Sequence, residues 1–160
     1  MEKVPITGEM RETVLETLGR SAWFKAFEDR AKATGASEPL NQIALMADLE
    51  RFSPDELILR EGYPADAFFL MLTGAATVRL ESRAGTELAR LEPPESFGEV
   101  GLLLEEPRTA SVVALEETLA LRFGTNAFRT MMETIPHFGF ETSRHLARRL
   151  KEFSEKLPAL

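Results

Sequence analysis

Residues 97–112 read FGEVGLLLEEPRTASV, and this stretch concentrates more chemically informative residues than any other part of the chain. Gly98 permits a tight turn from a strand into a helix and lets a ligand approach the backbone closely. A short helix that begins there directs free backbone N–H groups toward an anion. Arg108 follows the rigid Pro107 at the head of a strand, where its planar guanidinium can hold a phosphate. Glu99 can accept hydrogen bonds from hydroxyls, so the stretch fits a ligand that joins a phosphate to a sugar, as a nucleotide does.

Short strand-forming segments lie on both sides of this stretch and are separated by turn residues. Residues 68–72 (FFLML) form a continuous apolar run, which is typical of a strand buried on both faces. Residues 77–81 alternate between polar and apolar, as in a half-exposed strand. Further strands are expected at residues 57–59, 87–91, 111–114 and 119–123. Many short strands with regular turns predict a β-sandwich or jelly-roll barrel over residues 46–125.

Residues 1–45 before the barrel have a helical character. Apolar residues recur there at helical spacing, at Trp23, Phe24, Phe27 and Ala31. A second helix is expected to run on through Ile43, Leu45, Met46 and Leu49. The aromatic residues of the first helix are interpreted as packing anchors against the barrel rather than as a ligand platform.

Residues 126–160 after the barrel are expected to be helical again. Asn126 is the expected N-cap of a helix that Pro136 ends or kinks. A long amphipathic helix follows, and its apolar stripe consists of Leu146, Leu150, Phe153 and Leu157. Such a stripe can pack on the barrel or on a second copy of the chain, so Pro136 is interpreted as a hinge and the helix as a lid.

The stretch at residues 97–112 resembles the phosphate-binding cassette of cyclic-nucleotide-binding domains, which occur in catabolite activator proteins, in regulatory subunits of cAMP-dependent kinase and in gated channels. The cassette reads Phe-Gly-Glu, a small residue, Leu-Leu, a spacer, then Pro-Arg, a small residue, Ala and a β-branched strand. Upstream turns at residues 61–66 and 73–74 also resemble the family, and the resemblance covers about residues 45–150. It implies an α+β fold, in which a β-jelly-roll (double-stranded β-helix) barrel is flanked by N-terminal helices and a long C-terminal helix.

The resemblance also implies roles for individual residues. Glu99 would bind the ribose 2′-hydroxyl and Arg108 the cyclic phosphate, while the C-terminal helix would close near the base. Phe140, Arg144 and Phe153 are the candidates for contacting that base. The expected ligand-binding residues are Phe97, Gly98, Glu99, Gly101, Arg108, Thr109 and Ala110.

Some positions depart from the family pattern. Pro54-Asp55-Glu56 stands where Pro-Gly-Glu is common, and Pro93-Pro94 precedes the cassette where a glycine turn is usual. Gly101 replaces a frequent alanine, which loosens the short helix by up to about 1 kcal/mol. These changes affect turns rather than the groups assigned to the ligand, so they bear on affinity more than on fold.

Each cassette residue also has a purely structural interpretation. Arg108 can form an ion pair with Glu99, Glu105 or Glu106, and Glu99 can complement the dipole of its own helix. Thr109 can be an ordinary strand residue. The two histidines, His137 and His145, lie eight residues apart on the expected C-terminal helices and are interpreted as surface or interface residues rather than as metal ligands.

Composition excludes several classes of function. The 160 residues carry a formal net charge of −7, which disfavours direct DNA binding, and Arg144, Arg148, Arg149 and Lys151 are interpreted as a solvated helix face or a partner-docking patch. No apolar run is long enough to cross a membrane, and no signal peptide is indicated. The absence of cysteine excludes disulfides and thiolate metal sites and fits the cytoplasm.

The function predicted from these observations is a regulatory module that senses a cyclic nucleotide, cAMP in preference to cGMP, and catalyses no reaction. No cofactor or metal is expected. No output domain follows the last helix, so signalling is expected through an unidentified effector protein or through assembly, including a homodimer formed by the C-terminal helix, unless the chain is a fragment. One alternative is a cupin-like metalloenzyme, but no histidine precedes Pro136 to serve the strands. Another is a degenerate domain that no longer binds a nucleotide and acts as a protein-interaction scaffold.

Overall fold

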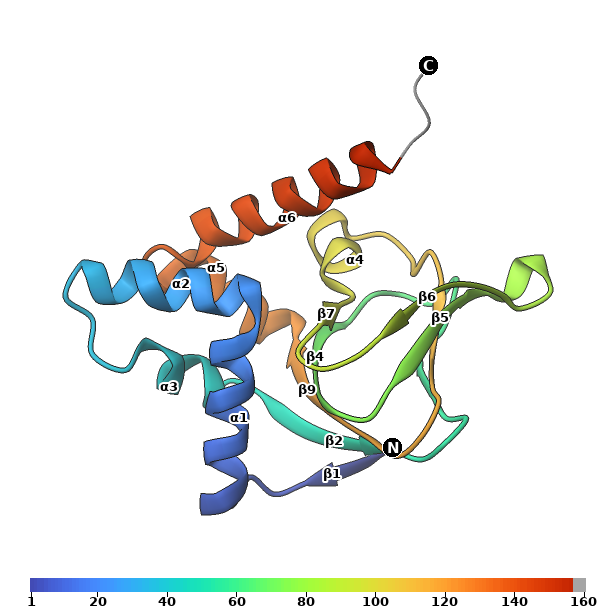
Figure 1. The fold of residues 1–160 in the computed structure, drawn as a ribbon, viewed down its shortest axis with the longest axis horizontal. Coiled ribbons are helices and arrows are strands. Elements are labelled where there is room, and N and C mark those ends of the chain that lie inside the picture. Colours follow the sequence, from blue (N-terminus) through green and yellow to red (C-terminus); the bar gives the residue numbers. More distant parts are fainter. Residues whose placement is uncertain (157–160) are drawn as a thin grey trace.

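The computed structural model describes residues 1–156, in which two antiparallel sheets form a barrel beside a group of helices (Figure 1). The first sheet has the strand order β1 (Glu2–Val4), β2 (Asp48–Phe52), β9 (Thr118–Gly124), β4 (Ala67–Thr73) and β7 (Ser96–Phe97). The second has the order β3 (Leu57–Leu59), β8 (Ser111–Ala114), β5 (Ala76–Leu80) and β6 (Thr86–Leu91). The predicted fold, a jelly-roll barrel flanked by helices, is confirmed.

The helices lie mostly to one side of the barrel (Figure 1). Before it come α1 (Gly8–Arg20), α2 (Ala22–Ala33) and α3 (Pro39–Ala44), and after it come α5 (Thr125–Thr134) and α6 (Phe138–Glu155). The short α4 (Glu99–Leu104) follows β7, and a 3₁₀ turn, η1 (Glu81–Arg83), joins β5 to β6. Figure 1 shows α4 beneath the outer part of α6, and Glu99 of α4 forms an ion pair with Arg149 of α6.

Strand β4 divides the core in two because its side chains alternate between faces. Phe68, Leu70 and Leu72 pack with the helices, whereas Phe69 and Met71 belong to the cluster inside the barrel. All five are buried, as the predicted two-sided strand requires. The same alternation explains how one apolar run connects the helices to the barrel wall.

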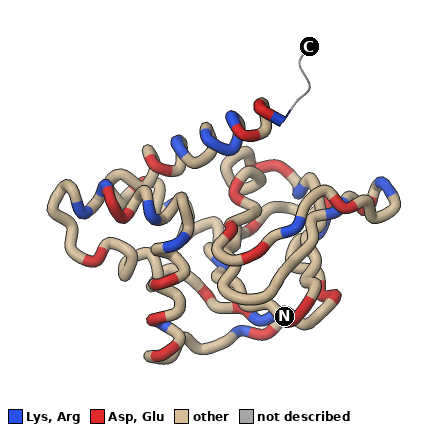
Figure 2. Tube along the Cα trace, in the orientation of Figure 1, with Lys and Arg blue, Asp and Glu red and all other residues tan. Residues whose placement is uncertain are grey.

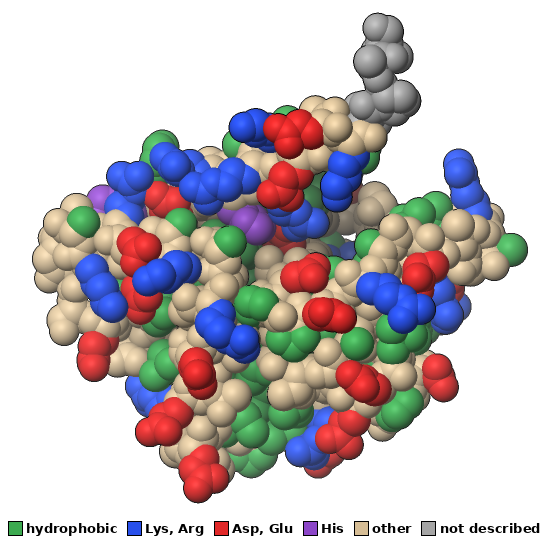
Figure 3. All heavy atoms as spheres, in the orientation of Figure 1, with side chains coloured by type: hydrophobic (Ala, Val, Ile, Leu, Met, Phe, Trp, Pro, Cys, Tyr) green, Lys and Arg blue, Asp and Glu red, His purple; other side chains and the backbone are tan. Residues whose placement is uncertain are grey.

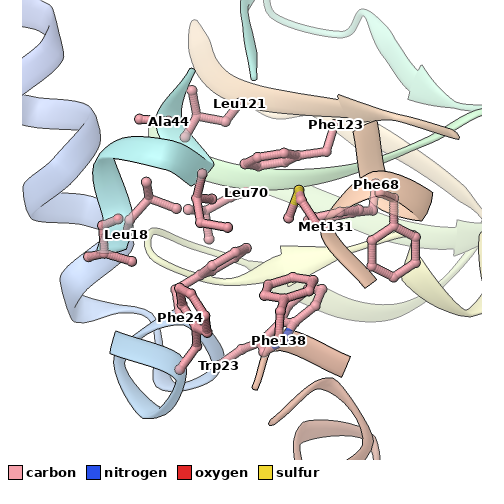
Figure 4. Close-up of a cluster of buried hydrophobic side chains, with 14 of the residues drawn as sticks. Leu18, Trp23, Phe24, Ala44, Phe68, Leu70, Leu121, Phe123, Met131 and Phe138 are labelled. Atoms are coloured by element: carbon pink, nitrogen blue, oxygen red, sulfur yellow. The ribbon is translucent and has the colours of Figure 1, made fainter. Parts of the chain in front are cut away.

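Aromatic rings join α2 and the start of α6 to the barrel (Figure 4). The Trp23 ring lies 5.1 Å from that of Phe68 and 5.6 Å from that of Phe138, and Phe68 stacks on Phe123 at 4.6 Å. Stacked and edge-on aromatic pairs add to the free energy gained by burying their surface. The expectation that Trp23 is a packing anchor agrees with its exposed fraction of 1%.

The prediction of a second helix through Leu49 is wrong in its length. The observed helix, α3, ends at Ala44, and Leu49 lies on β2 opposite Leu121 of β9. Pro39 suits the first turn of α3, where no backbone N–H is needed. Leu49 packs in the core from a strand as well as it would from a helix, so short apolar spacing alone does not separate the two. The short strand β1, which pairs with β2, also lies in the segment expected to be helical.

The first two turns of α6 are fixed to α2. The indole nitrogen of Trp23 donates a hydrogen bond to Thr142 Oγ1 at 3.1 Å, and Arg30 Nε donates to Glu141 Oε1 at 2.5 Å. Phe138 is fully buried, whereas Leu150 and Phe153 farther along the helix are 67% and 63% exposed. Part of the predicted apolar stripe therefore faces solvent, and its last member, Leu157, lies outside the described residues.

Candidate functional site

A cavity of about 300 Å³ lies between α4, the sheet that contains β5 and β6, and α6. Apolar side chains of Val78, Ala89 and Leu91 form part of its wall. All seven residues expected to bind a ligand line it, namely Phe97, Gly98, Glu99, Gly101, Arg108, Thr109 and Ala110. The sequence stretch of residues 97–112 therefore forms one side of a single concave site.

Arg108 is held against the backbone of the same loop. Its Nη1 donates to Gly98 O at 2.8 Å, and its Nη2 donates to Ala67 O at 2.5 Å. Within residues 1–156 its acidic partner is Asp66, at 3.7 Å, and not one of the three glutamates considered from sequence. Burial lowers the pKa of Arg108 and Asp66 opposes this shift, but a guanidinium stays charged in either case. The two carbonyls fix the orientation of this cation and leave other N–H donors of the fork for a ligand.

Glu99, at the start of α4, is fully buried, and its two oxygens differ. Oε1 forms an ion pair with Arg149 Nη1 and lies 3.8 Å from His145 Nε2, both on α6. Oε2 is buried and has no hydrogen-bond partner within the described chain. Burial alone acts to raise the pKa of Glu99, but His145, the charge of Arg149 and a backbone N–H together lower it. The carboxylate is thus ionised at neutral pH and retains one free acceptor.

Thr109 and Ala110 form the bend between Arg108 and β8. Thr109 is exposed and lies before the strand begins, so the interpretation as an ordinary strand residue does not describe its position. The backbone directly before the bend is anchored, because Arg108 O accepts from Gly62 N and Arg108 N donates to Tyr63 O, both at 2.8 Å. A rigid bend of this kind can hold Thr109 at the rim of the cavity.

Two glycines let the cassette backbone pack closely. Gly98 has a φ of +93°, in the left-handed region that other residues rarely adopt. At Gly101 an added Cβ would lie 2.8 Å from Ala65 Cβ. This contact gives a physical reason for the departure from the frequent alanine: α4 packs against Ala65 too closely for a second methyl group.

Gly101→Ala is therefore expected to destabilise the fold even though alanine is the better helix former. Overpacking costs about 1–3 kcal/mol, which exceeds the gain of up to about 1 kcal/mol in helix propensity. The matched variant Gly101→Ala/Ala65→Gly removes the opposing methyl and should recover most of the loss. Thermal unfolding of the three proteins checks this, and a stabilised single variant would contradict the packing argument.

The three residues expected to contact a base do not line the cavity. Phe140 is 57% exposed, and the guanidinium groups of Arg30 and Arg144 lie 5.2 and 6.0 Å from the centre of its ring. Phe153 is one turn beyond Arg149 and is exposed. The α6 residue that lines the cavity is Arg149, four residues after His145. Sequence reasoning placed Arg149 in a charge cluster, and its spacing from His145 was the available signal for a shared helix face.

Basic side chains are frequent on α6, among a smaller number of acidic ones. Figure 2 shows Lys and Arg repeated along α6, and Figure 3 shows acidic side chains on the barrel face below it.

Among residues 1–156 no cluster of three His, Asp or Glu side chains is placed to hold a metal ion. In the same part of the chain, no helix combines the length and apolar character needed to cross a membrane.

Known proteins are similar to this chain. The family model described as "Cyclic nucleotide-binding domain" matches residues 49–135. A cAMP-dependent protein kinase regulatory subunit of Emericella nidulans is 32% identical over 71% of the chain and 28% of its own length. A cGMP-dependent protein kinase of Eimeria tenella is 29% identical over 58% of the chain and 9% of its own length. The chain therefore spans less than a third of these curated relatives.

Among solved structures, the Thermus thermophilus catabolite activator protein is 29% identical, with a TM-score of 0.68 over 76% of this chain and 58% of its own.

Proposed function

The chain belongs to the cyclic nucleotide-binding domain family, and we propose that it is a regulatory module that senses cAMP in preference to cGMP and catalyses no reaction. The observation that carries this proposal is the placement of Glu99 and Arg108 on one cavity wall, with Glu99 Oε2 unpartnered. A ligand with a hydroxyl donor beside an anion would satisfy both groups at once. The regulatory subunit and the kinase to which the chain is similar are named for cAMP and cGMP dependence.

In the proposed complex, the free N–H groups of Arg108 and the backbone around Gly98 and Gly101 bind the cyclic phosphate. Glu99 Oε2 accepts a hydrogen bond from the ribose 2′-hydroxyl, while Arg149 and His145 hold Oε1 in place. Arg149 thus acts as a positioning residue, because it fixes the carboxylate that contacts the ligand. Val78, Ala89 and Leu91 offer an apolar surface to the base.

We further propose that the outer half of α6, residues 147–155, transmits the signal. The packing of Phe138 and Thr142 against α2 favours a moving part beyond His145 rather than a hinge at Pro136. The exposure of Leu150 and Phe153 supports a lid over the cavity or an isologous contact with the same helix of a second copy. A helix face with two ways to be buried can switch between them when a ligand favours one. An effector protein that recognises the altered helix completes this proposal, with the cytoplasm as its location.

A specific observation favours a second candidate, a scaffold that binds no nucleotide. Two backbone carbonyls accept hydrogen bonds from Arg108, and Arg149 neutralises Glu99, so both charges have partners without a ligand. Calorimetric titration with cAMP and cGMP separates the two candidates. Saturable heat with either nucleotide supports the sensor, and no heat at millimolar concentration supports the scaffold.

Thr109→Ala tests the choice of nucleotide. In some members of the family that this chain resembles, a threonine directly after the arginine favours cGMP, because its hydroxyl can bond to the exocyclic amine of guanine. At the rim of this cavity the hydroxyl can equally bond to the phosphate, which both nucleotides carry. We therefore expect Thr109→Ala to weaken cAMP and cGMP alike, by about three- to tenfold for the loss of one hydrogen bond. Loss of cGMP affinity with unchanged cAMP affinity would assign Thr109 to the guanine instead.

A further inference from the structure

A second cavity, of about 390 Å³, adjoins the nucleotide cavity. It lies where α1 meets α2, beside the turn before β7 and under α6. Leu91 and Arg149 line both cavities and form part of the partition between them. Glu99 does not line this second cavity, so the nucleotide site proposed above makes no use of it.

The second cavity is lined by two arginines although the chain as a whole is acidic, with a net charge of −7. These are Arg20 and Arg149, and the lining contains a single acid, Glu95. Glu95 Oε1 accepts a hydrogen bond from the backbone N–H of Glu92 at 3.4 Å, which already occupies one side of that carboxylate. Two guanidinium groups therefore face this cavity on a chain whose net charge would otherwise repel an anion.

Both arginines have donors to spare. Arg20, the last residue of α1, forms no ion pair or side-chain hydrogen bond within residues 1–156. Arg149 uses Nη1 for Glu99, and in the same described part of the chain its other nitrogens have no hydrogen-bond partner. An arginine carries five N–H donors in a planar fork, so Arg149 can hold Glu99 and an anion at once.

We propose that this second cavity binds a phosphate group, and that Arg149 couples its occupancy to the nucleotide site. Two guanidinium forks match the several oxygens of a phosphate better than the two of a carboxylate. The Ser21 N-cap of the twelve-residue helix α2 makes no side-chain capping bond, so N–H groups of its first turn add donors on the same side. The volume of about 390 Å³ accommodates a phosphate together with the group that carries it.

The coupling follows from the contacts. A phosphate that binds Arg149 fixes the guanidinium that orients Glu99, and Glu99 then presents Oε2 to the ribose hydroxyl. This step rests on the proposed nucleotide function. Because coupling between two sites is reciprocal, phosphate must raise the affinity for cAMP by the same factor by which cAMP raises the affinity for phosphate.

The phosphate can be a free ion or the second phosphate of a cyclic dinucleotide that spans both cavities. The free ion predicts that inorganic phosphate strengthens cAMP binding. The dinucleotide predicts that cyclic di-AMP binds more tightly than cAMP, and that this advantage disappears when Arg20 is replaced. Either result supports the second cavity as a phosphate site, and the pair of measurements distinguishes the sources.

Trp23 provides a built-in probe, because it is the only tryptophan of the chain, lines the second cavity and stacks on His145 at 4.9 Å. We expect a saturable change in its fluorescence with inorganic phosphate at constant ionic strength, together with binding heat by calorimetry. Arg20→Gln should weaken phosphate binding at least tenfold. The matched control is Arg11→Gln on the exposed side of the same helix, which should leave phosphate binding unchanged.

The proposed site is overturned if the native protein shows neither a fluorescence change nor binding heat with phosphate. It is also overturned if Arg20→Gln responds to phosphate as strongly as the native protein does. The failure of the nucleotide proposal can be recognised separately, because Arg20 does not line the nucleotide cavity and Arg108→Ala leaves the second cavity intact. Phosphate binding that persists without any cAMP binding overturns the nucleotide function alone. Phosphate and cAMP binding without mutual influence, and without tighter binding of cyclic di-AMP, overturns the coupling.

Discussion

Arg108→Ala is expected to lower the affinity for cAMP by about ten- to a hundredfold, toward the upper end of that range. One charge-assisted hydrogen bond contributes about 1.5–3 kcal/mol, so the loss of a single bond to the cyclic phosphate already corresponds to this range. Glu99→Ala should weaken binding within the same range, because it removes the acceptor for the ribose hydroxyl. Isothermal titration calorimetry of the two variants measures both losses.

Arg108 also contributes to the stability of the loop, so the effect of Arg108→Ala on folding must be measured alongside its effect on affinity. Removing Arg108 also leaves Gly98 O and Ala67 O without their side-chain donors, so the variant is expected to be less stable as well. Arg108→Lys keeps a cation but cannot reproduce the planar fork, and it should not restore full affinity. Arg90→Ala, which removes an exposed arginine of β6 that does not line the cavity, is the matched control. Unchanged affinity in both Arg108→Ala and Glu99→Ala would show that the cassette does not bind the phosphate and the ribose.

Local sequence indicated that residues 97–112 would come together in space, and the structure places the seven expected residues on one cavity. Gly98 permits the tight turn and Pro107 restricts the backbone before Arg108, so the local sequence indicated that both charges lie on one loop between strands. The strand at residues 68–72 was also predicted correctly, because five consecutive apolar residues indicate a strand that is buried on both faces. In both cases residues that are close in sequence determine the local backbone conformation.

Features that depend on distant contacts were not predictable in this way. Leu49 has the same apolar character in a helix as in the strand that pairs with β9, and only that pairing decides between them. Arg149 stands among cations that suit a solvated helix face, yet a buried carboxylate fifty residues earlier draws it inward. Gly101 departs from the family pattern because of Ala65, a neighbour in space from another loop. The missed details of the site are thus contacts between α6, α4 and the barrel.

Removing residues 147–160, and with them the outer half of α6, is expected to weaken cAMP binding by ten- to a hundredfold or more. The cut takes away Arg149, which leaves the fully buried Glu99 without its charge partner, and it uncovers one side of the cavity. A cut before Phe138 would be uninformative, because Phe138 is fully buried and Thr142 bonds to Trp23. A cut after Leu146 keeps these contacts, so the barrel and α2 should still fold. Calorimetry and the mass in solution report affinity and assembly.

Two point variants separate the contributions of the helix. Arg149→Ala removes the partner of Glu99 but leaves the helix, whereas Arg148→Ala removes an exposed neighbouring cation that does not line the cavity. If α6 closes over the ligand, truncation weakens binding more than Arg149→Ala does, and Arg148→Ala has no effect. If the outer half of α6 also joins two copies, the truncated chain is a monomer where the full chain is a dimer. A truncated protein that keeps both its affinity and its oligomeric state would exclude α6 as lid and as interface, because no other part of the helix reaches the cavity in the described chain.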